Sequence, residues 1–308
     1  MYHYVRKGSD KSPYFIHLDV DDFEKQIDYL LSNYKILSKE EFEKNIKNKS
    51  IINDGIVLTF DDGLSDHYEY VYPILTKKNL WGIFYIPTFP YQNKQLLDVH
   101  RIHYLLGKYG GENVLDKLSL LIKSKDFIKS SEKLFGASTY LKQDNDFYTT
   151  KVKQIINYYL QPHKRSDILK KLLDIFKENE NEICKNFYLT KSQINLMIEG
   201  GMSIGNHGHS HTLFSNLSDL EQCNEIITSN DILSDLTDGN DYKSFCYPYG
   251  GKQSYNNYTL KCLNEYNFTF AFSVESKDIE VSDIIKKYEL PRYDCNEFMY
   301  GKATKGKK

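Results

Sequence analysis

Carboxylates and imidazoles follow two short apolar segments of this chain. Asp61 and Asp62 come directly after one such segment, and His207 and His211 come after another much later in the sequence. One carboxylate and two imidazoles can bind a divalent metal ion and leave coordination positions open for water and substrate. Such an ion makes a bound water more acidic and polarises a carbonyl oxygen. The residue types therefore indicate a metal-dependent hydrolase.

The two adjacent carboxylates have separate expected roles. We expect Asp62, His207 and His211 to bind the metal, and Asp61 to take a proton from the water as a general base. Neighbouring residues on a strand point to opposite sides, so both carboxylates can serve one site only where the strand bends. Gly63 gives the backbone the freedom to bend there.

Each of these motifs is weak when taken alone. An Asp-Asp-Gly after an apolar run is commonly a turn, and a His-x-x-x-His is commonly a surface or core pair. In this order, each after a predicted strand, they make a more specific signal. His209 alternates with the two ligand candidates, and we assign it to solvent or to support of a metal ligand.

The elements around these residues alternate between strand and helix. Ile56–Phe60 is apolar throughout, which is typical of a parallel strand buried on both faces. A helix over Asp66–Lys78 and a strand over Trp81–Pro87 complete a βαβ unit. Further strands are predicted at Met202–Gly205, Ser244–Tyr247, Thr269–Ser273 and Tyr288–Tyr293. The pattern predicts an α/β fold with a parallel sheet, open or closed into a barrel, and active sites of such barrels lie after the strands.

The chain is predicted to have a long insertion. Residues 91–186 are highly charged and mainly helical in pattern, which indicates a helical insertion between two barrel strands. Residues 1–55 form an α/β extension packed on the barrel, the barrel spans 56–298, and 299–308 is a basic tail.

Composition argues against several classes of partner. The 40 basic and 42 acidic residues nearly cancel, which gives no reason to expect binding to nucleic acid or to a membrane surface. No apolar run reaches the roughly 18 residues that a membrane span needs. The five cysteines are an odd number without a Cys-x-x-Cys pair. Together with the lack of an export signal, they predict reduced thiols and a cytoplasmic location.

Three segments carry a resemblance to one enzyme family. They are Thr59–Gly63 (TFDDG), Ile204–His211 (IGNHGHSH) and Phe245–Gly250 (FCYPYG). They resemble the motifs T-F-D-D-G, I-G-x-H-[ST]-x-x-H and F-R-x-P-[YFW]-G of the polysaccharide deacetylase family, the NodB-homology or carbohydrate esterase family 4 group. The opening segment Met1–Val5 is similar to the lead-in of longer members. The resemblance covers roughly residues 1–90 and 188–298.

This resemblance implies a distorted (β/α) barrel of about seven strands, NodB-like, with the helical segment as an insertion. It also implies metal-dependent hydrolysis of an N-acyl, sometimes O-acyl, group on a sugar. By position, Asp61 is the base and Asp62, His207 and His211 bind the metal. The backbone N–H of Tyr249 is the expected donor to the oxyanion.

The chain departs from the family motifs at two positions. The arginine of the third motif falls on Cys246, and Arg292 either replaces it from a neighbouring strand end or is a surface arginine. The family's general acid is a late histidine in an L-x-H motif, and no histidine follows the second motif here. His100 and His103, on one face of a predicted helix, are candidates for this role or structural residues of the insertion. Otherwise the base itself returns the proton.

We therefore expect a metal-dependent amidohydrolase that removes an acetyl or formyl group from an amino sugar. The substrate would be an N-acylated sugar or sugar nucleotide, a precursor of a surface glycan. Zinc is the first choice of metal, and iron, cobalt, nickel or manganese also fit the ligands. Two alternatives stay open: a hydrolase of a non-sugar amide, and an inactive glycan-binding homologue.

Overall fold

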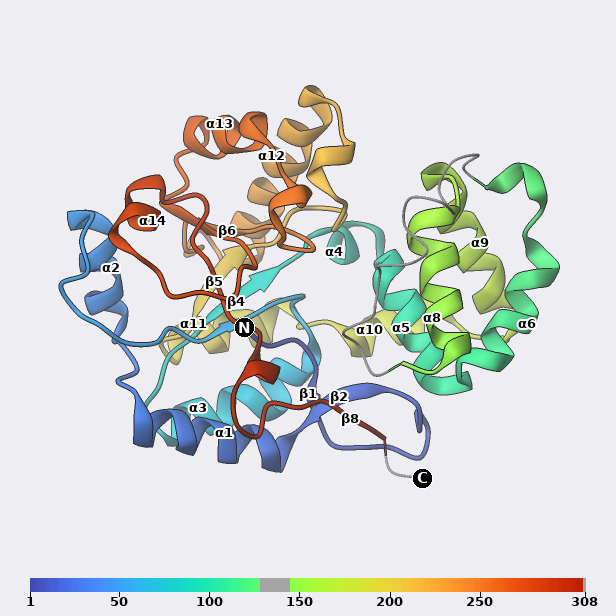
Figure 1. Ribbon diagram of the computed structural model, residues 1–308, viewed down its shortest axis with the longest axis horizontal. Coiled ribbons are helices and arrows are strands. Elements are labelled where there is room, and N and C mark those ends of the chain that lie inside the picture. The colour runs from blue at the N-terminus through green and yellow to red at the C-terminus, as the bar shows by residue number, and fades with distance from the viewer. Residues whose placement is uncertain (128–144, 307–308) are drawn as a thin grey trace. The chain divides into compact units, whose positions relative to one another are not determined.

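The chain divides into two compact units. The computed structural model describes residues 1–127 and 145–306 (Figure 1). The first unit contains Met1–Lys7, His17–Gln95 and Lys185–Thr304, and the second contains Gly8–Ile16, Leu96–Cys184 and the end of the chain. Residues 128–144 of the predicted insertion, and Lys307 and Lys308 of the predicted tail, lie outside the described residues.

A five-stranded parallel sheet forms the centre of the first unit. Its strands follow one another in chain order: β3 (Thr59–Phe60), β4 (Ile83–Ile86), β5 (Ser203–Asn206), β6 (Ser244–Cys246) and β7 (Phe270–Phe272). Every residue of these strands is buried, as their apolar sequences predict. Single parallel bridges extend the sheet at both edges, Tyr2 beside Phe60 and Leu290 beside Phe272. The sheet curls as part of a barrel, so the predicted NodB-like fold class is confirmed.

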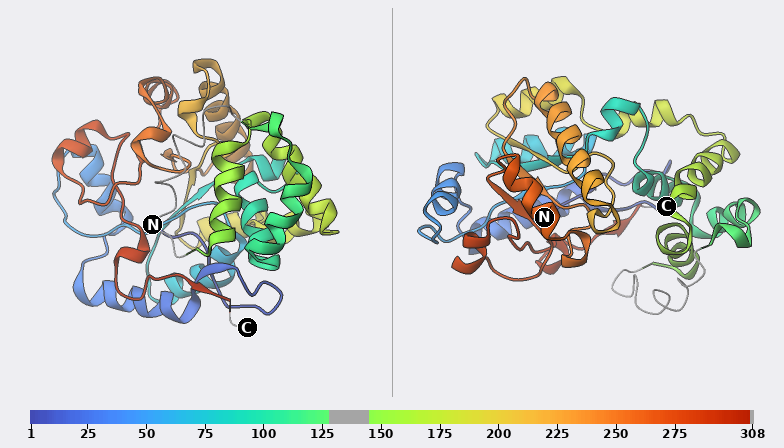
Figure 2. Two further views of the ribbon diagram at one scale, coloured as in Figure 1. Left: turned by 45° about the vertical axis from the view of Figure 1, so that its right-hand side comes forward. Right: turned by 90° about the horizontal axis from the view of Figure 1, so that it is seen from above.

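Helices lie on the sheet between the strands (Figures 1 and 2). They are α1 (Val20–Asn33), α2 (Lys39–Asn48), α3 (Tyr72–Lys77), α4 (Phe89–Asn93), α11 (Lys191–Glu199), α12 (Asp219–Leu236), α13 (Asn257–Glu265) and α14 (Val281–Lys286). The short strands β1 (Val5–Arg6) and β2 (Ile16–Asp19) pair in parallel, and β8 (Thr304–Lys305) lies near the end of the chain. Capping boxes at Ser38 and Thr190 begin α2 and α11.

The predicted helix over Asp66–Lys78 has two parts. A π-helical turn covers His67–Val71, and α3 follows from Tyr72. Pro73 is the second residue of α3 and has no backbone N–H to donate into the turn before it. The helix is therefore irregular directly before the proline, where the π-helical turn lies.

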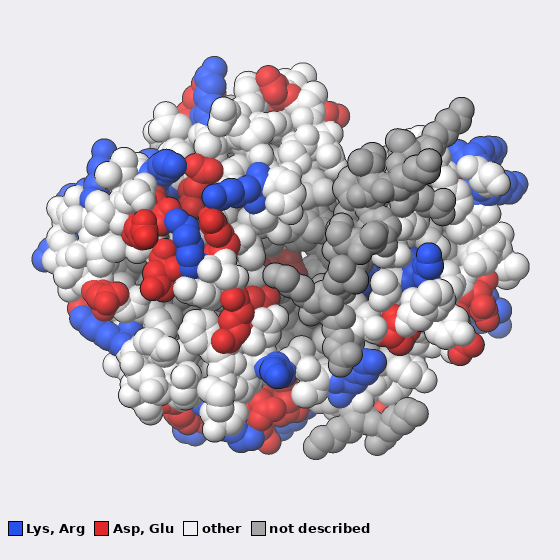
Figure 3. Space-filling model, viewed as in Figure 1, with Lys and Arg blue, Asp and Glu red and all other residues white. Residues whose placement is uncertain are grey.

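The second unit is helical in its described part. It contains α5 (Asp98–Tyr109), α6 (Gly111–Leu121), α8 (Phe147–Gln154) and α9 (Pro162–Ile175), and α10 (Glu180–Phe187) runs from it into the first unit. These helices share a core of their own that includes Leu105, Leu118, Val152 and Leu172. No helix among the residues described is long and apolar enough to cross a membrane. On the face in Figure 3, the described basic and acidic side chains are interspersed.

One expectation about the cysteines is wrong. Cys223 and Cys262 form a disulfide, whereas the sequence predicted reduced thiols throughout. The two residues are 39 positions apart in the chain, but α12 and α13 bring their Cα atoms to 5.9 Å, within the usual range for a disulfide. Cys184, Cys246 and Cys295 are free thiols. Cysteine spacing along the chain could not show that these two helices are neighbours.

Candidate active site

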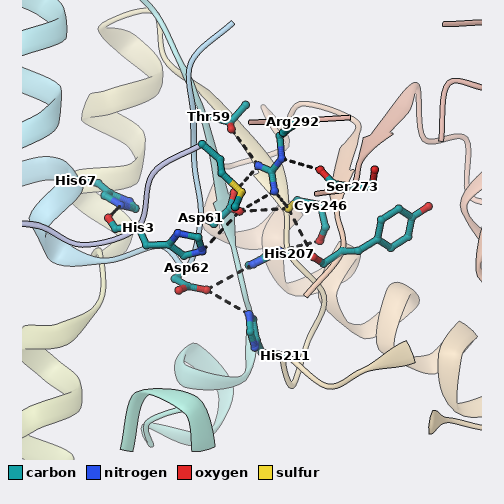
Figure 4. A network of polar contacts seen from close by, with 12 residues as sticks. His3, Thr59, Asp61, Asp62, His67, His207, His211, Cys246, Ser273 and Arg292 are labelled. Atoms are coloured by element: carbon teal, nitrogen blue, oxygen red, sulfur yellow. Dashed lines mark hydrogen bonds and ion pairs between the residues drawn. The ribbon is translucent and has the colours of Figure 1, made fainter. Parts of the chain in front are cut away.

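The chemically active side chains of the first unit gather where its parallel strands end (Figure 4). Asp61 and Asp62 follow β3, His207 follows β5, and Cys246 is the last residue of β6. Because neighbouring parallel strands end at the same edge, residues from distant parts of the chain meet there. All four side chains are buried.

Asp62, His207 and His211 form a group that fits one divalent metal ion. Oδ1 of Asp62 lies 3.5 Å from Nε2 of His207 and 3.3 Å from Nε2 of His211. One ligand atom from each residue lies within 4.8 Å of the others. Two donors bound to zinc at about 2.0–2.1 Å and at a tetrahedral angle are about 3.3 Å apart. The observed spacing therefore matches a shared first coordination shell.

The ring orientation of His207 also suits a metal ligand. Its Nδ1 lies 2.7 Å from the backbone oxygen of Cys246. A carbonyl oxygen only accepts, so Nδ1 carries a hydrogen, and Nε2 is the nitrogen on the side of Asp62 that can bind a metal. Metal-binding histidines are commonly fixed by such a bond from the other ring nitrogen.

A second possible group shares His207 but suits a cation less well. Asp61, His207 and Cys246 also offer ligand atoms within 4.8 Å of one another. However, the guanidinium of Arg292 lies against both Asp61 and Cys246. A metal ion there would be next to a buried positive charge, so we assign the metal to Asp62, His207 and His211.

Three residues at this site have left-handed backbone conformations. Asp62, His211 and Tyr249 have φ values of 79°, 55° and 64°, in the left-handed region that side chains other than glycine seldom adopt. The bend that lets both carboxylates face the site is therefore made at Asp62 as well as at Gly63, which has φ 60°. Sequence analysis expected the glycine alone to provide it.

Glu225 of α12 holds the loop between the two histidine ligands. Its carboxylate accepts from the backbone N–H of His209 at 3.0 Å and from that of Ser210 at 2.8 Å. It also accepts from the Ser210 hydroxyl at 2.7 Å. His209 itself forms a hydrogen bond between Nδ1 and the Thr88 hydroxyl at 2.9 Å, outside the metal group. The loop is thus fixed from a helix that supplies no metal ligand.

Arg292 forms a two-point ion pair with Asp61. Nη1 is 2.9 Å from Oδ1, and Nη2 is 2.8 Å from Oδ2. Burial raises the pKa of Asp61, but the charge and hydrogen bonds of Arg292, together with the nearby imidazoles of His207 and His3, outweigh it and hold that pKa well below its usual range. Arg292 also donates to the Thr59 hydroxyl and to the Ser273 carbonyl. Asp61 is therefore a fixed, ionised carboxylate.

Cys246 fills the space beside this ion pair. Its Sγ lies 2.9 Å from Nη2 of Arg292 and 3.5 Å from Oδ2 of Asp61. Burial raises the pKa of the thiol, so it stays neutral at physiological pH. Arg292 therefore binds Asp61 from a different position in the chain than the arginine of the family motif, whose place Cys246 takes.

Comparisons with known proteins give the same family as the motifs. A family model described as polysaccharide deacetylase matches residues 159–271, a range that includes the second and third motifs. The resemblance to the polysaccharide deacetylase family is confirmed. Its members are hydrolases of carbon–nitrogen bonds other than peptide bonds, which confirms the predicted enzyme class. No curated protein sequence matches the chain.

Solved structures of deacetylases share the fold. The deacetylase PplD from Streptococcus pyogenes in complex with acetate has a TM-score of 0.56 at 18% identity, covering 95% of this chain and 88% of that chain. A de-N-acetylase from Aggregatibacter actinomycetemcomitans has a TM-score of 0.53 at 14% identity, covering 94% and 91% respectively. At these identities the likeness concerns the fold.

His3 is a further residue of the site that the sequence analysis did not predict. Nε2 of His3 lies 4.0 Å from Oδ2 of Asp61, and its side chain is 39% exposed. The parallel bridge between Tyr2 and Phe60 brings it there. The opening segment was already similar to longer family members, and the histidine within that segment was the available signal.

The other expected site residues stay predictions. His100 and His103 lie in α5 of the second unit, with ring centroids 6.4 Å apart. Tyr249 follows β6, and its ring centroid lies 5.2 Å from that of His211, so its backbone is near the metal group. The side chain of Tyr249 is exposed.

Proposed function

We propose that this chain is a metal-dependent deacylase that removes an acetyl or formyl group from the nitrogen of an amino sugar. One observation carries the proposal. A three-ligand metal group and an ionised spare carboxylate lie side by side at the end of the sheet. The spare carboxylate distinguishes a hydrolytic site from a metal site that only stabilises the fold.

The residues of the chain divide the reaction between them. A divalent ion held by Asp62, His207 and His211 would acidify a water and polarise the substrate carbonyl. Asp61 accepts the proton of that water as its oxygen adds to the carbonyl carbon. Because the water is acidified, a carboxylate with a low pKa is a sufficient base. Arg292 keeps Asp61 ionised and in place.

His3 is the proposed proton donor to the leaving nitrogen. As the carbon–nitrogen bond breaks, the electron pair goes to nitrogen, and His3 supplies the proton that makes a neutral amine. The products are a free amine and a carboxylic acid, acetate or formate. The side chain is close to Asp61 and partly exposed, so it can regain a proton from solvent. We prefer it to His100 and His103 because it lies in the unit that holds the site.

The proposed substrate is an N-acylated sugar or sugar nucleotide used for a surface glycan. The exposed Tyr249 ring beside His211 supports a sugar, because sugar faces stack on aromatic rings. The names of the two similar structures, a deacetylase and a de-N-acetylase, point the same way. Zinc is the proposed metal, and iron, cobalt, nickel or manganese would fit the same ligands.

The cytoplasmic location is a proposal with one feature against it. Disulfides such as Cys223–Cys262 are typical of oxidising compartments. Mass spectrometry of the protein, alkylated directly in its cells, decides between the cytoplasm and an oxidising compartment. Alkylated Cys223 and Cys262 would support the cytoplasm, and a linked pair would support an oxidising compartment.

An inactive glycan-binding homologue is the alternative with a specific observation in its favour. Cys246 stands where the family motif has an arginine, which is a change expected in a protein that has lost activity. The ion pair between Arg292 and Asp61 counts against it, because Arg292 supplies the same charge from the segment that follows Leu290. We therefore favour an active enzyme.

The test is release of a carboxylic acid from defined substrates. Purified protein with its metal content measured is incubated with N-acetylglucosamine oligomers and with N-acyl nucleotide sugars. We expect acetate or formate to appear in equal amount to free amine, and Asp61→Asn to abolish both. Absence of release from every substrate by metal-loaded protein would contradict the proposal.

A further inference from the structure

A buried histidine lies behind the proposed proton donor. His67 is fully buried, with its ring centroid 5.8 Å from that of Phe60 and 5.6 Å from that of Phe84. Its Nε2 lies 2.9 Å from the backbone oxygen of His3. Since a carbonyl oxygen only accepts, Nε2 of His67 carries the hydrogen and donates it. The bond joins residues 64 positions apart.

The segment around His3 is attached to the rest of the first unit on both sides of that residue. Before it, the backbone N–H of Tyr2 donates to Thr59 and that of Asp61 donates to Tyr2, both at 2.9 Å. After it, Arg6 forms an ion pair with Asp66 at 2.7 Å. The bond from His67 holds the backbone at His3 itself (Figure 4). Asp66 and His67, two consecutive residues, therefore fix one short segment at two points.

The choice of a histidine at this position needs a reason beyond packing. Nδ1 of His67 is buried and has no hydrogen-bond partner among the residues that the structure describes. A buried polar atom without a partner is unfavourable, and an apolar side chain would pack beside the two stacked phenylalanine rings without this penalty. The donor at Nε2 is what an apolar side chain could not supply.

We propose that His67 is a positioning residue that holds the backbone of His3, so that the His3 imidazole stays beside Asp61. The inference rests on the proposed function in one respect, the role of His3 as proton donor. The structural part, that the donor on His67 fixes the first six residues, stands independently.

The experiment compares two substitutions of nearly equal shape. His67→Gln keeps a donor near the position of Nε2, and His67→Met does not. We expect H67M to lower kcat on the order of tenfold with KM and metal content unchanged, because small displacements of a catalytic group have large effects. H67Q should retain near wild-type kcat. In a His3→Gln background, H67M should cause no further loss.

A matched control removes a similar buried clamp elsewhere in the same unit. Asn45 of α2 is buried, its Nδ2 donates to the backbone oxygen of Asn53 at 2.6 Å, and its Oδ1 accepts from the backbone N–H groups of Ile52 and Asn53, both at 3.0 Å. Asn45→Leu therefore loses comparable hydrogen bonds to a backbone segment other than the one that contains His3. We expect its kcat to equal that of the wild type, which separates positioning of His3 from general loosening of the fold.

Two measurements do not depend on turnover. Hydrogen exchange of a peptide covering residues 1–6 should accelerate in H67M and not in H67Q. In the wild type, nitrogen-15 NMR should show the hydrogen of His67 on Nε2, which requires no variant to fold. Wild-type kcat in H67M, an equal loss in the His3→Gln background, or a hydrogen on Nδ1 would each overturn the proposal. If the wild type releases no acid, the function fails, and exchange and NMR still decide the positioning.

Discussion

Asp61 and Asp62 are neighbours in the chain, yet they lie in opposite electrostatic surroundings. Asp61 is matched by the guanidinium of Arg292, which lies against both of its oxygens. Asp62 faces two imidazoles that point their Nε2 atoms toward it. The acid–base half of the site, Asp61 with Arg292 and His3, already contains a positive charge that balances its carboxylate. The metal half, Asp62 with His207 and His211, would obtain that charge from a bound metal ion.

The two halves also differ in how their geometry is held. The acid–base half relies on the buried ion pair between Asp61 and Arg292, and the thiol of Cys246 fills the space beside it. The metal half relies on left-handed backbone at Asp62 and His211, and on a loop fixed by Glu225. The difference teaches that metal binding and proton transfer should be separable by mutation.

The largest effect is expected in the metal half. Asp62→Ala removes one of three protein ligands, so we expect loss of bound metal and activity at the background level. Elemental analysis and acid release measure the two. Chelation of the wild type should have the same effect, and added zinc should restore the chelated wild type but not the variant. Full activity after complete metal removal would contradict the assignment.

The next largest effect is expected at Asp61. Asp61→Asn removes the base, so kcat should fall by about 10²–10⁴ while metal content is unchanged. The substitution also leaves Arg292 without a carboxylate, and breaking a buried ion pair destabilises a protein by about 3–5 kcal/mol. Thermal unfolding of the same sample therefore serves as the control. Loss of metal in folded D61N would show that metal binding depends on Asp61, and the two halves would then not be separable by mutation.

A pH effect on stability is expected from His67, which supports the acid–base half. Burial lowers the pKa of His67 from 6.5 to about 4. Between these values the unfolded chain binds a proton that the folded chain does not, so stability falls as pH decreases through this range. The loss is about 3 kcal/mol by pH 4.

Urea unfolding of the wild type and His67→Gln isolates this contribution. The free energy of unfolding of the variant relative to that of the wild type should increase as the pH is lowered from 7 to 4, because glutamine does not titrate. A difference that is the same at both pH values would show that His67 takes up its proton in the folded protein. Other titrating groups are common to both proteins and cancel.

Much of this site could be predicted from residue order, and particular parts could not. Short apolar strands ending in Asp61, Asp62 and His207 are local patterns, so fold class and metal group follow from the sequence. His3 could not be placed, because its neighbourhood depends on a parallel bridge between Tyr2 and Phe60. The disulfide between Cys223 and Cys262 could not be predicted for the same reason, since it depends on the packing of two helices. Contacts made by tertiary pairing leave little trace in local spacing.

A smaller effect is expected at the support of the metal loop. Glu225→Met removes both oxygens that accept from His209 and Ser210, and it keeps a side chain of similar length. Residues that orient ligands typically contribute 10–100-fold to metal affinity, and we expect a loss in this range. Competition with a chelating dye measures it. Glu221→Met is the matched control, because Glu221 lies on the same helix and its carboxylate accepts from the capping residue Ser218. Equal losses in both variants would indicate a general effect of α12.

The smallest effect is expected at Cys246, although it occupies a motif position. If Arg292 supplies the charge that the motif arginine would supply, the thiol only fills space, and Cys246→Ala should change kcat by less than about threefold. The expected stability change is about 1 kcal/mol, from the small cavity that remains. Arg292→Met is the contrasting variant, because it removes the charge and keeps the bulk. It should lower kcat far more than C246A does. A loss in C246A as large as in R292M would show that the thiol takes part in holding Asp61, and the two halves would then share Cys246 through its carbonyl bond to His207.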